Sequence, residues 1–131
     1  MGKAYILDTN IVIYFLDGKL PEKSLDFVET RLNKSGSILS VITKIELLGW
    51  QAPSAQATQV IDQFVRESKI ILLSEEIVEK TIEIRRNYRV KLPDAVIAAT
   101  AKVCDYVLIS RNDGDFRKID GLMYENPFSE A

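Results

Sequence analysis

The stretch YILDTNIV, residues 5–12, places three polar side chains at the end of an apolar run. Residues 5–7 have the apolar character of a buried strand, and Asp8, Thr9 and Asn10 follow directly. Apolar residues then resume with the spacing of a short helix. A buried strand that leads straight into a helix is the basic unit of an α/β fold. Asp8 is therefore placed either to cap the helix or to face a site at the end of the strand.

The length and composition of the chain fit one domain, residues 1–131. Hydrophobic residues make up 47% of the chain, which is ordinary for a globular protein. No apolar run reaches the roughly 18 residues that a membrane span needs, and no signal-peptide pattern precedes the first strand. We therefore expect a cytoplasmic protein. Its single cysteine, Cys104, excludes an intrachain disulfide.

The ionisable residues restrict the chemistry that the protein can perform. The chain has no histidine, which excludes histidine-based catalytic triads and histidine zinc sites. Catalysis would have to use carboxylates, hydroxyls, amines or a metal held by oxygen ligands. With 17 basic and 19 acidic residues the net charge is −2, so the sequence lacks a globally basic nucleic-acid footprint. The densest local cluster of positive charge is RRNYRVK, residues 85–91.

Short apolar segments alternate with segments of helical spacing along the chain. Turn-forming Gly, Pro, Ser, Asn and Asp residues separate many of them. The pattern predicts strands at 4–7, 37–41, 69–73, 106–109 and 122–125. It predicts helices at 9–16, 24–34, 43–50, 55–67, 75–89 and 93–104, and a loop at 110–115. Because the strands are short, apolar and separated by helices, the fold class is α/β with a parallel sheet covered on both faces.

Two further acids occupy positions where a purely structural role is common. Thr43 and Glu46 match a capping box, with Thr43 as the N-cap of a helix and Glu46 three residues on. Asp94 follows Pro93, and both residue types are typical of the first turn of a helix. Considered singly, each acid is explained by helix capping or by the helix dipole.

Considered together, the acids predict a common site. The carboxyl ends of parallel strands meet at one edge of a sheet, so Asp8 should lie near the loop after residue 109, within reach of Glu46 and Asp94. Two carboxylates about 4 Å apart repel by roughly 4 kcal/mol at an effective dielectric constant of 20. Either a shared proton or a divalent cation relieves that repulsion. Oxygen ligands favour Mg²⁺ or Mn²⁺ over zinc, and two such ions can activate a water and stabilise the leaving oxygen of a phosphodiester.

Four stretches extend this pattern over nearly the whole chain, in order: ILDTNIVIYFL, SVITKIELLGW, KLPDAVIAATAKV and LISRNDGDFRKIDGL. Together they resemble PIN-domain proteins of the VapC toxin type. The resemblance implies a three-layer α/β/α domain with a mainly parallel central sheet, and endoribonuclease activity that depends on Mg²⁺ or Mn²⁺. It also implies a homodimer and inhibition by a cognate antitoxin. The family's acidic residues map onto Asp8, Glu46 and Asp94, as catalytic residues and metal ligands.

The family's fourth acidic position falls in the loop that follows residue 109. The family pattern there matches Ser110, Asn112 and Asp115, with Phe116 as the anchor of the loop. The resemblance implies that Asn112 and Asp115 complete the metal site and that Asp115 contributes to catalysis. Asp113 is an additional candidate for completing the acidic site. It belongs to an Asp-Gly pair, however, which typically sits at an exposed turn, so we expect its side chain to point to solvent.

Other side chains have auxiliary roles in this interpretation. Thr9, Asn10, Thr43 and Ser110 are expected to support the acids. The candidates for holding the RNA backbone are Lys44, Arg85, Arg86, Arg89, Lys91 and Arg111. Under an alternative hypothesis, the protein has the PIN fold but a catalytically silent site, and it acts as a protein-binding module.

Overall fold

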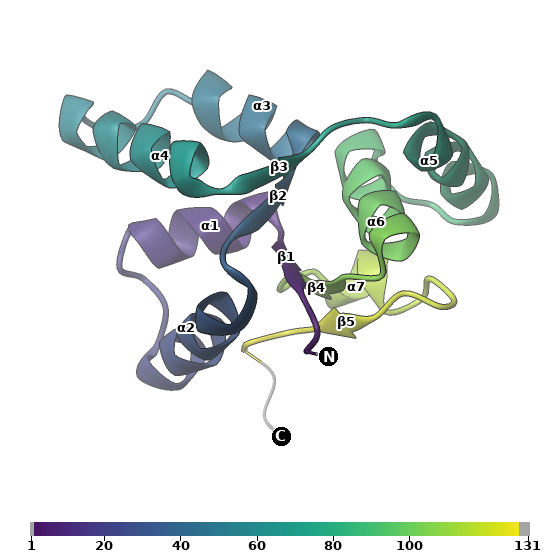
Figure 1. Cartoon of the computed structure of the whole chain (residues 1–131), viewed down its shortest axis with the longest axis horizontal. Helices are drawn as coiled ribbons and strands as arrows, with labels where there is room; N and C mark the ends of the chain where they lie inside the picture. The colour runs from purple at the N-terminus through teal and green to yellow at the C-terminus, as the bar shows by residue number, and fades with distance from the viewer. Residues whose placement is uncertain (1, 129–131) are drawn as a thin grey trace.

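The centre of the molecule is a parallel β-sheet, seen in a computed structural model that describes residues 2–128 (Figure 1). Its strands are β1 (Tyr5–Leu7), β2 (Ile38–Ser40), β3 (Lys69–Ile71), β4 (Val107–Ile109) and β5 (Tyr124–Glu125). They lie in the order β3-β2-β1-β4-β5, and every neighbouring pair is parallel. The carboxyl ends of all five strands therefore point toward the same edge of the sheet.

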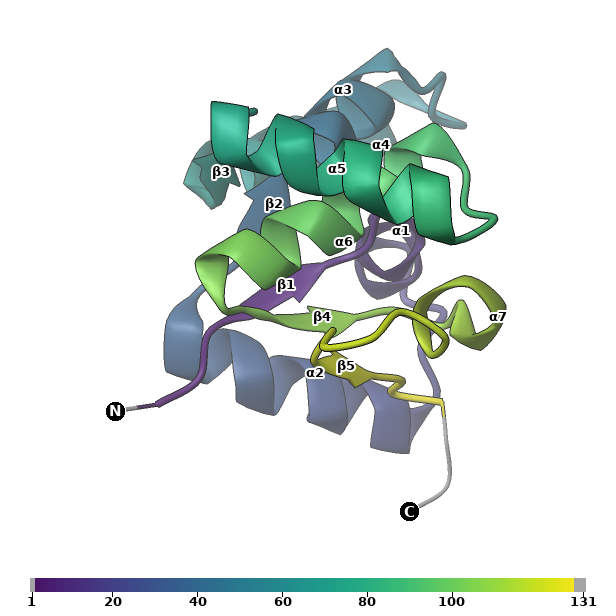
Figure 2. The same ribbon diagram turned by 90° about the vertical axis from the view of Figure 1, so that its right-hand side faces the viewer.

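Helices cover both faces of this sheet (Figures 1 and 2). One face carries α1 (Thr9–Leu16), α2 (Glu22–Ser35) and α4 (Ala55–Glu67), and the other carries α5 (Glu75–Asn87) and α6 (Leu92–Cys104). Helix α3 (Val41–Gly49) contacts both α4 and α6, and the short α7 (Asp113–Phe116) follows β4. The arrangement confirms the predicted three-layer α/β/α architecture. Within residues 2–128, no helix combines the length and apolar character needed to cross a bilayer.

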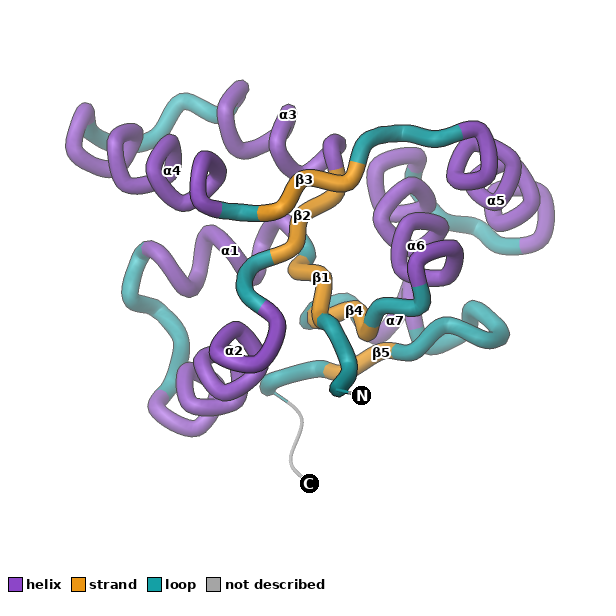
Figure 3. The backbone as a smooth tube through the Cα atoms, in the orientation of Figure 1, coloured by secondary structure: helices purple, strands orange, loops and turns teal. Residues whose placement is uncertain are grey.

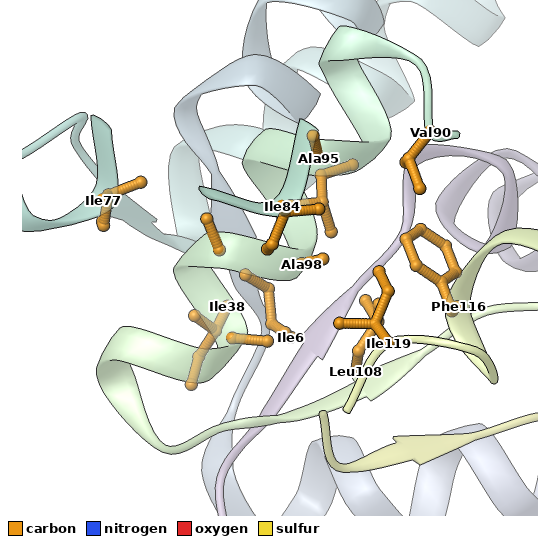
Figure 4. Packing of buried hydrophobic residues seen from close by; sticks show 13 residues of the cluster. Ile6, Ile38, Ile77, Ile84, Val90, Ala95, Ala98, Leu108, Phe116 and Ile119 are labelled. Atoms are coloured by element: carbon orange, nitrogen blue, oxygen red, sulfur yellow. The ribbon is translucent and has the colours of Figure 1, made fainter. Parts of the chain in front are cut away.

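Successive side chains of the central strands point to opposite faces of the sheet, which divides the core into two hydrophobic clusters. On β1, Tyr5 and Leu7 join the cluster under α1, α2 and α4, while Ile6 joins the cluster under α5 and α6. Figure 4 shows the second cluster, in which Leu108 of β4 and Phe116 of α7 also take part. Each fully buried side chain of this kind contributes about 1.5–3 kcal/mol relative to exposure. Burial on both faces explains why the strands are uniformly apolar.

The predicted capping box at the start of α3 is wrong. The helix begins directly after β2, and the N-cap is Ser40, whose hydroxyl accepts a hydrogen bond from the backbone N–H of Ile42 at 3.1 Å. Thr43 lies inside the helix and is buried. The strand and the helix share one boundary because β2 is only three residues long and the chain turns immediately after it. Glu46 therefore does not belong to a capping box.

The remaining differences from the prediction are at element ends, as the tube in Figure 3 shows. Strand β3 ends at Ile71, and the two leucines that follow it are exposed. The loop expected at 110–115 contains α7, a single helical turn that the sequence pattern did not predict. A four-residue helix is too short to display helical periodicity, so the hydrophobic pattern carries no signal for it.

Candidate active site

Asp8 occupies the carboxyl end of the central strand β1 and is only 6% exposed. Its backbone N–H donates to the carbonyl of Ile109 in β4 at 3.0 Å, and its Oδ2 accepts a hydrogen bond from the Ser110 hydroxyl at 2.7 Å. Asp8 precedes α1, but its side chain makes no capping hydrogen bond. Burial raises the pKa of the Asp8 carboxyl, and the hydrogen bond from Ser110 acts in the opposite direction. The carboxylate is thus fixed, costly to ionise and unused by the helix.

Asp94 lies in the first turn of α6, as predicted, next to Pro93. It is half-buried, and its pKa is raised to about 7. Burial is the main cause, followed by the negative charge of Asp8 and by a hydrogen bond with Asp115. A hydrogen bond between two carboxyl groups requires that one of them carry a proton. The structure therefore brings Asp8 and Asp115 close enough to Asp94 to raise the pKa of its carboxyl.

Glu46 approaches the same place from α3, with an exposed side chain. The hydroxyl of Thr9 donates to its Oε1 at 2.7 Å, and the charge of Glu46 raises the pKa of both Asp8 and Asp94. We call Asp8, Glu46, Asp94 and Asp115 the acidic edge. Its members come from four segments that are far apart in the sequence.

The loop after β4 is organised around Asn112 and Asp115. Asn112 is the N-cap of α7: its Oδ1 accepts from the backbone N–H of Asp115 at 3.3 Å, and its Nδ2 donates to Asp115 Oδ2 at 2.9 Å. Phe116 is 1% exposed, which confirms its predicted role as the anchor of the loop. The amide of Asn112 thus orients the carboxylate that hydrogen bonds to Asp94.

The side chain of Asp113 is 45% exposed to solvent, as expected at a turn, but it is also held by neighbouring side chains. Its Oδ1 accepts hydrogen bonds from the Tyr124 hydroxyl at 2.6 Å and from Asn126 Nδ2 at 3.1 Å, and it forms an ion pair with Arg117 at 3.2 Å. Asp113 therefore ties the site loop to β5 and the residues that follow it. No local sequence pattern indicates Tyr124 and Asn126 as partners, because their approach depends on β5 pairing beside β4.

The predicted support residues divide into those that contact the acids and one that does not. Ser110 is buried and holds Asp8. The Thr9 hydroxyl lies within hydrogen-bonding distance of Glu46 and, at 3.0 Å, of the buried Thr43 hydroxyl. Asn10 is exposed on α1, and its side chain makes no hydrogen bond to any residue that the structure describes, so the side chain does not brace the turn.

Four of the six predicted RNA-binding cations lie together in the basic loop, which we define as residues 85–91. They line an open cleft of about 730 Å³, and Asp115 of the acidic edge lines the same cleft. The four are Arg85, Arg86, Arg89 and Lys91. The other two candidates lie outside it: Lys44 is exposed on α3, and the guanidinium of Arg111 lies 4.2 Å from the ring centre of Phe128.

The donor atoms of the acidic edge suit a hard divalent cation. They are carboxylate oxygens, with the Asn112 amide beside them. Asp8, Glu46 and Asp94 make no ion pair with any residue in 2–128, so no basic side chain there neutralises them directly. In that part of the chain, no three His, Cys, Asp or Glu side chains already converge on a common metal position. A metal would thus draw the carboxylates together and compete with the hydrogen bond between Asp94 and Asp115.

Comparison with known families identifies the fold. The family model of the PIN domain matches residues 5–122. This range includes the four carboxylates of the acidic edge and the amide of Asn112. The chain belongs to the PIN domain family. This confirms the resemblance drawn from the sequence. No curated protein gives a significant sequence match.

Several solved structures share the architecture of this PIN domain. A toxin-antitoxin complex from Klebsiella pneumoniae is similar with a TM-score of 0.75 and 29% identity, over 97% of this chain and 100% of that chain. VapBC2 from Rickettsia felis, bound to a promoter DNA fragment, gives a TM-score of 0.79 at 24% identity, over 94% and 98%. DNA-bound VapBC from Salmonella typhimurium gives 0.81 at 22% identity, over 96% and 99%.

Proposed function

We propose that this PIN domain is a metal-dependent endoribonuclease and the toxin of a toxin–antitoxin pair. The observation that carries the proposal is the acidic edge: the pKa values of Asp8 and Asp94 are raised by burial and by neighbouring carboxylates, and three of the four acids have no ion-pair partner among residues 2–128. Such an arrangement weakens the folded state unless it binds a cation. Perturbed carboxylates in a group of this kind are typical of catalytic sites.

Each acid has a distinct role in this proposal. Asp8, Glu46 and Asp94 hold Mg²⁺ or Mn²⁺, and Asn112 and Asp115 complete the site. Such a cation, when bound, polarises a phosphodiester and lowers the pKa of a water. Ser110 fixes the orientation of Asp8 through its 2.7 Å hydrogen bond. Asp94 and Asp115 release the proton of their shared hydrogen bond when both carboxylates are needed as ligands.

The proposed partners are an RNA substrate, a cognate antitoxin and a second copy of the chain. Support for the antitoxin comes from similar structures that are themselves toxin-antitoxin complexes. Asp8, Glu46 and Asp94, which make no ion pair within residues 2–128, suit a basic side chain from an inhibitor, which would compete with the metal. Support for a homodimer comes from apolar side chains left at the surface, such as Ile45 at 60% and Leu72 at 70% exposed.

The decisive experiment compares RNA cleavage by the wild type and by Asp94→Asn. We expect the wild type to cut RNA with Mn²⁺ and not with chelator, and Asp94→Asn to lose the activity while melting no earlier than the wild type in chelator. Asp26→Asn, on the exposed surface of α2, is the matched control and should cleave normally. A wild type that binds its antitoxin tightly but never cleaves RNA would favour the silent binding module.

The partner proposal has a separate test. We expect the product of the adjacent gene, co-expressed with this chain, to bind tightly and to place an Arg or Lys near Asp8 and Asp94. A structure of the complex with no basic group within hydrogen-bonding distance of either carboxylate would contradict this part of the proposal.

A further inference from the structure

We propose that the basic loop is the track on which single-stranded RNA lies as it enters the site, holding phosphates next to the one that is cut. The inference rests on the proposed ribonuclease function and adds the path of the substrate. One cleft of about 730 Å³ has the basic loop along its wall and Asp115 of the acidic edge at its border. A bound strand can therefore contact both regions at once.

The charges in the basic loop are exposed and unpaired. None of its four cations forms an ion pair with any residue in 2–128. Elsewhere the same residue types find partners: Lys80 lies 3.0 Å from Glu83, and Lys19 lies 3.1 Å from Asp17. In a chain of net charge −2 with 19 acidic residues, four unpaired cations along one cleft form a local positive potential. The ligand that such a potential attracts is an anion.

The helix dipole explains the positions of only two of the four cations in the basic loop. Arg85 and Arg86 lie in the last turn of α5, where positive charge complements the helix dipole. Arg89 lies beyond the end of that helix, and Lys91 is the N-cap of α6, where the dipole disfavours a cation. Neither of these two side chains gains from its helix, so their charge is available for a ligand.

The backbone of the basic loop is nevertheless held firmly beside the site loop. Lys118 Nζ donates to the carbonyl of Arg89 at 2.9 Å, and the backbone N–H of Asp120 donates to the Tyr88 hydroxyl at 3.1 Å. Val90 belongs to the same buried hydrophobic cluster as Phe116, the anchor of the site loop (Figure 4). The loop thus presents mobile charged ends on a fixed base, at a constant position relative to Asp115.

A phosphate polymer fits this arrangement better than an acidic protein segment. The cleft joins the four cations to Asp115 of the acidic edge. Under the proposed function, its ligand brings repeated negative charge to the loop and one more anion to a metal beside Asp115. A single RNA strand does both with one repeating group. Three of the four cations are arginines, whose guanidinium groups bind phosphate oxygens in bidentate fashion.

The test is RNA binding in chelator, where no cleavage occurs. We would measure the affinity of the full chain for a short fluorescein-labelled single-stranded RNA by anisotropy, over a series of salt concentrations. The test variant combines Arg85→Gln, Arg86→Gln, Arg89→Gln and Lys91→Gln. The matched control removes the same charge from exposed positions on α2, α4 and β3 through Lys23→Gln, Lys34→Gln, Arg66→Gln and Lys69→Gln.

We expect the test variant to bind at least about tenfold more weakly, with the slope of log affinity against log salt reduced by about 2–3, since each phosphate contact on a single strand contributes about 0.7. The control should bind like the wild type. Equal losses of RNA affinity in the two variants would contradict the proposed track, because the loss would then depend on the net charge of the protein and not on the basic loop. An unchanged RNA affinity together with weaker antitoxin binding would assign the loop to the protein partner instead.

The same experiment separates this inference from the proposed function. If the test variant binds RNA normally while Asp94→Asn still abolishes cleavage, the proposed RNA track is wrong and the proposed ribonuclease function is supported. If the wild type neither binds nor cleaves RNA, both proposals fail.

Discussion

The acidic edge reaches the cleft of the basic loop through Asp115, yet the two regions are built in opposite ways. In the acidic edge, side-chain hydrogen bonds hold the carboxylates: Ser110 holds Asp8, Thr9 holds Glu46 and Asn112 holds Asp115. In the basic loop, hydrogen bonds from Lys118 and to Tyr88 hold the loop in place, and the charged side-chain ends have no ion-pair partner within residues 2–128.

The difference reflects what each region would bind. A metal ion needs oxygen atoms at defined positions, and hydrogen bonds that restrict the carboxylates reduce the cost of bringing them to those positions. A flexible phosphate chain needs mainly positive potential, which side chains on a fixed backbone supply without a single geometry. We therefore expect substitutions in the acidic edge to be far more damaging than substitutions in the basic loop.

The largest expected effect is that of Asp8→Asn on cleavage. We expect a loss of at least about a hundredfold, or about 2.7 kcal/mol of transition-state stabilisation, because the central oxygen ligand is weakened. Arg89→Gln should cost less than about tenfold, since one phosphate contact is only part of the binding. Initial rates with saturating Mn²⁺ measure both. Similar losses of cleavage rate in the two variants would contradict the expectation that the acidic edge is more sensitive to substitution than the basic loop.

The next effect separates Asp115 from Asp113 in the site loop. Asp115→Asn should reduce cleavage about tenfold, equivalent to about 1.4 kcal/mol, because it alters the hydrogen bond with Asp94 and the amide contact to Asn112. Asp113→Asn should change the rate less than about threefold and instead loosen the attachment of β5. The free energy of unfolding by urea, with Tyr124→Phe as the partner variant, measures that loosening. A larger rate loss in Asp113→Asn would reverse the assignment.

A smaller effect is expected from metal binding itself. Mn²⁺ at about five times its dissociation constant should stabilise the wild type by about 1 kcal/mol and raise its melting temperature by a few degrees. The basic-loop variants should show the same shift, because they do not contact the metal. Asp8→Asn should show none. A shift that persists in Asp8→Asn would place the metal elsewhere in the molecule.

The smallest effect is a pH dependence of stability in chelator. The pKa of Asp94 is raised to about 7 in the folded protein, so the folded state keeps a proton that the unfolded chain releases above about pH 4. Stability should therefore fall as the pH rises from about 4 to 7 and then level off. After allowance for solvent screening of this half-buried group, we expect a contribution of about 1 kcal/mol.

Urea unfolding of Asp94→Asn over the same pH range is the control for this prediction. The variant cannot titrate at residue 94, so its stability should fall less than that of the wild type between pH 4 and 7. Parallel pH profiles for the two proteins would show that the carboxylate is not perturbed in the folded state.

Much of the scaffold could be predicted from the sequence, because it is specified locally. The apolar strands, the helical spacing and the Gly and Pro breaks each depend on residues a few positions apart. They predicted the strand and helix order, the parallel sheet and the positions of Asp8 and Asp94 at a strand end and a helix start. Local chemistry failed where two local solutions competed, as when Thr43 matched a capping box but Ser40 capped the helix, and where an element was too short to show periodicity, as in α7.

What the tertiary structure alone decided is which side chains meet. The hydrogen bond that fixes Asp8 comes from Ser110, 102 residues away in the sequence, and Asp113 is held by side chains beyond the next strand. The hydrogen bond between Asp94 and Asp115, and the cleft that Asp115 shares with the basic loop, likewise exist only after the sheet has assembled. Hydrophobic periodicity records which face of an element is buried, whereas a polar contact depends on the relative placement of elements, which is set when their buried faces pack together.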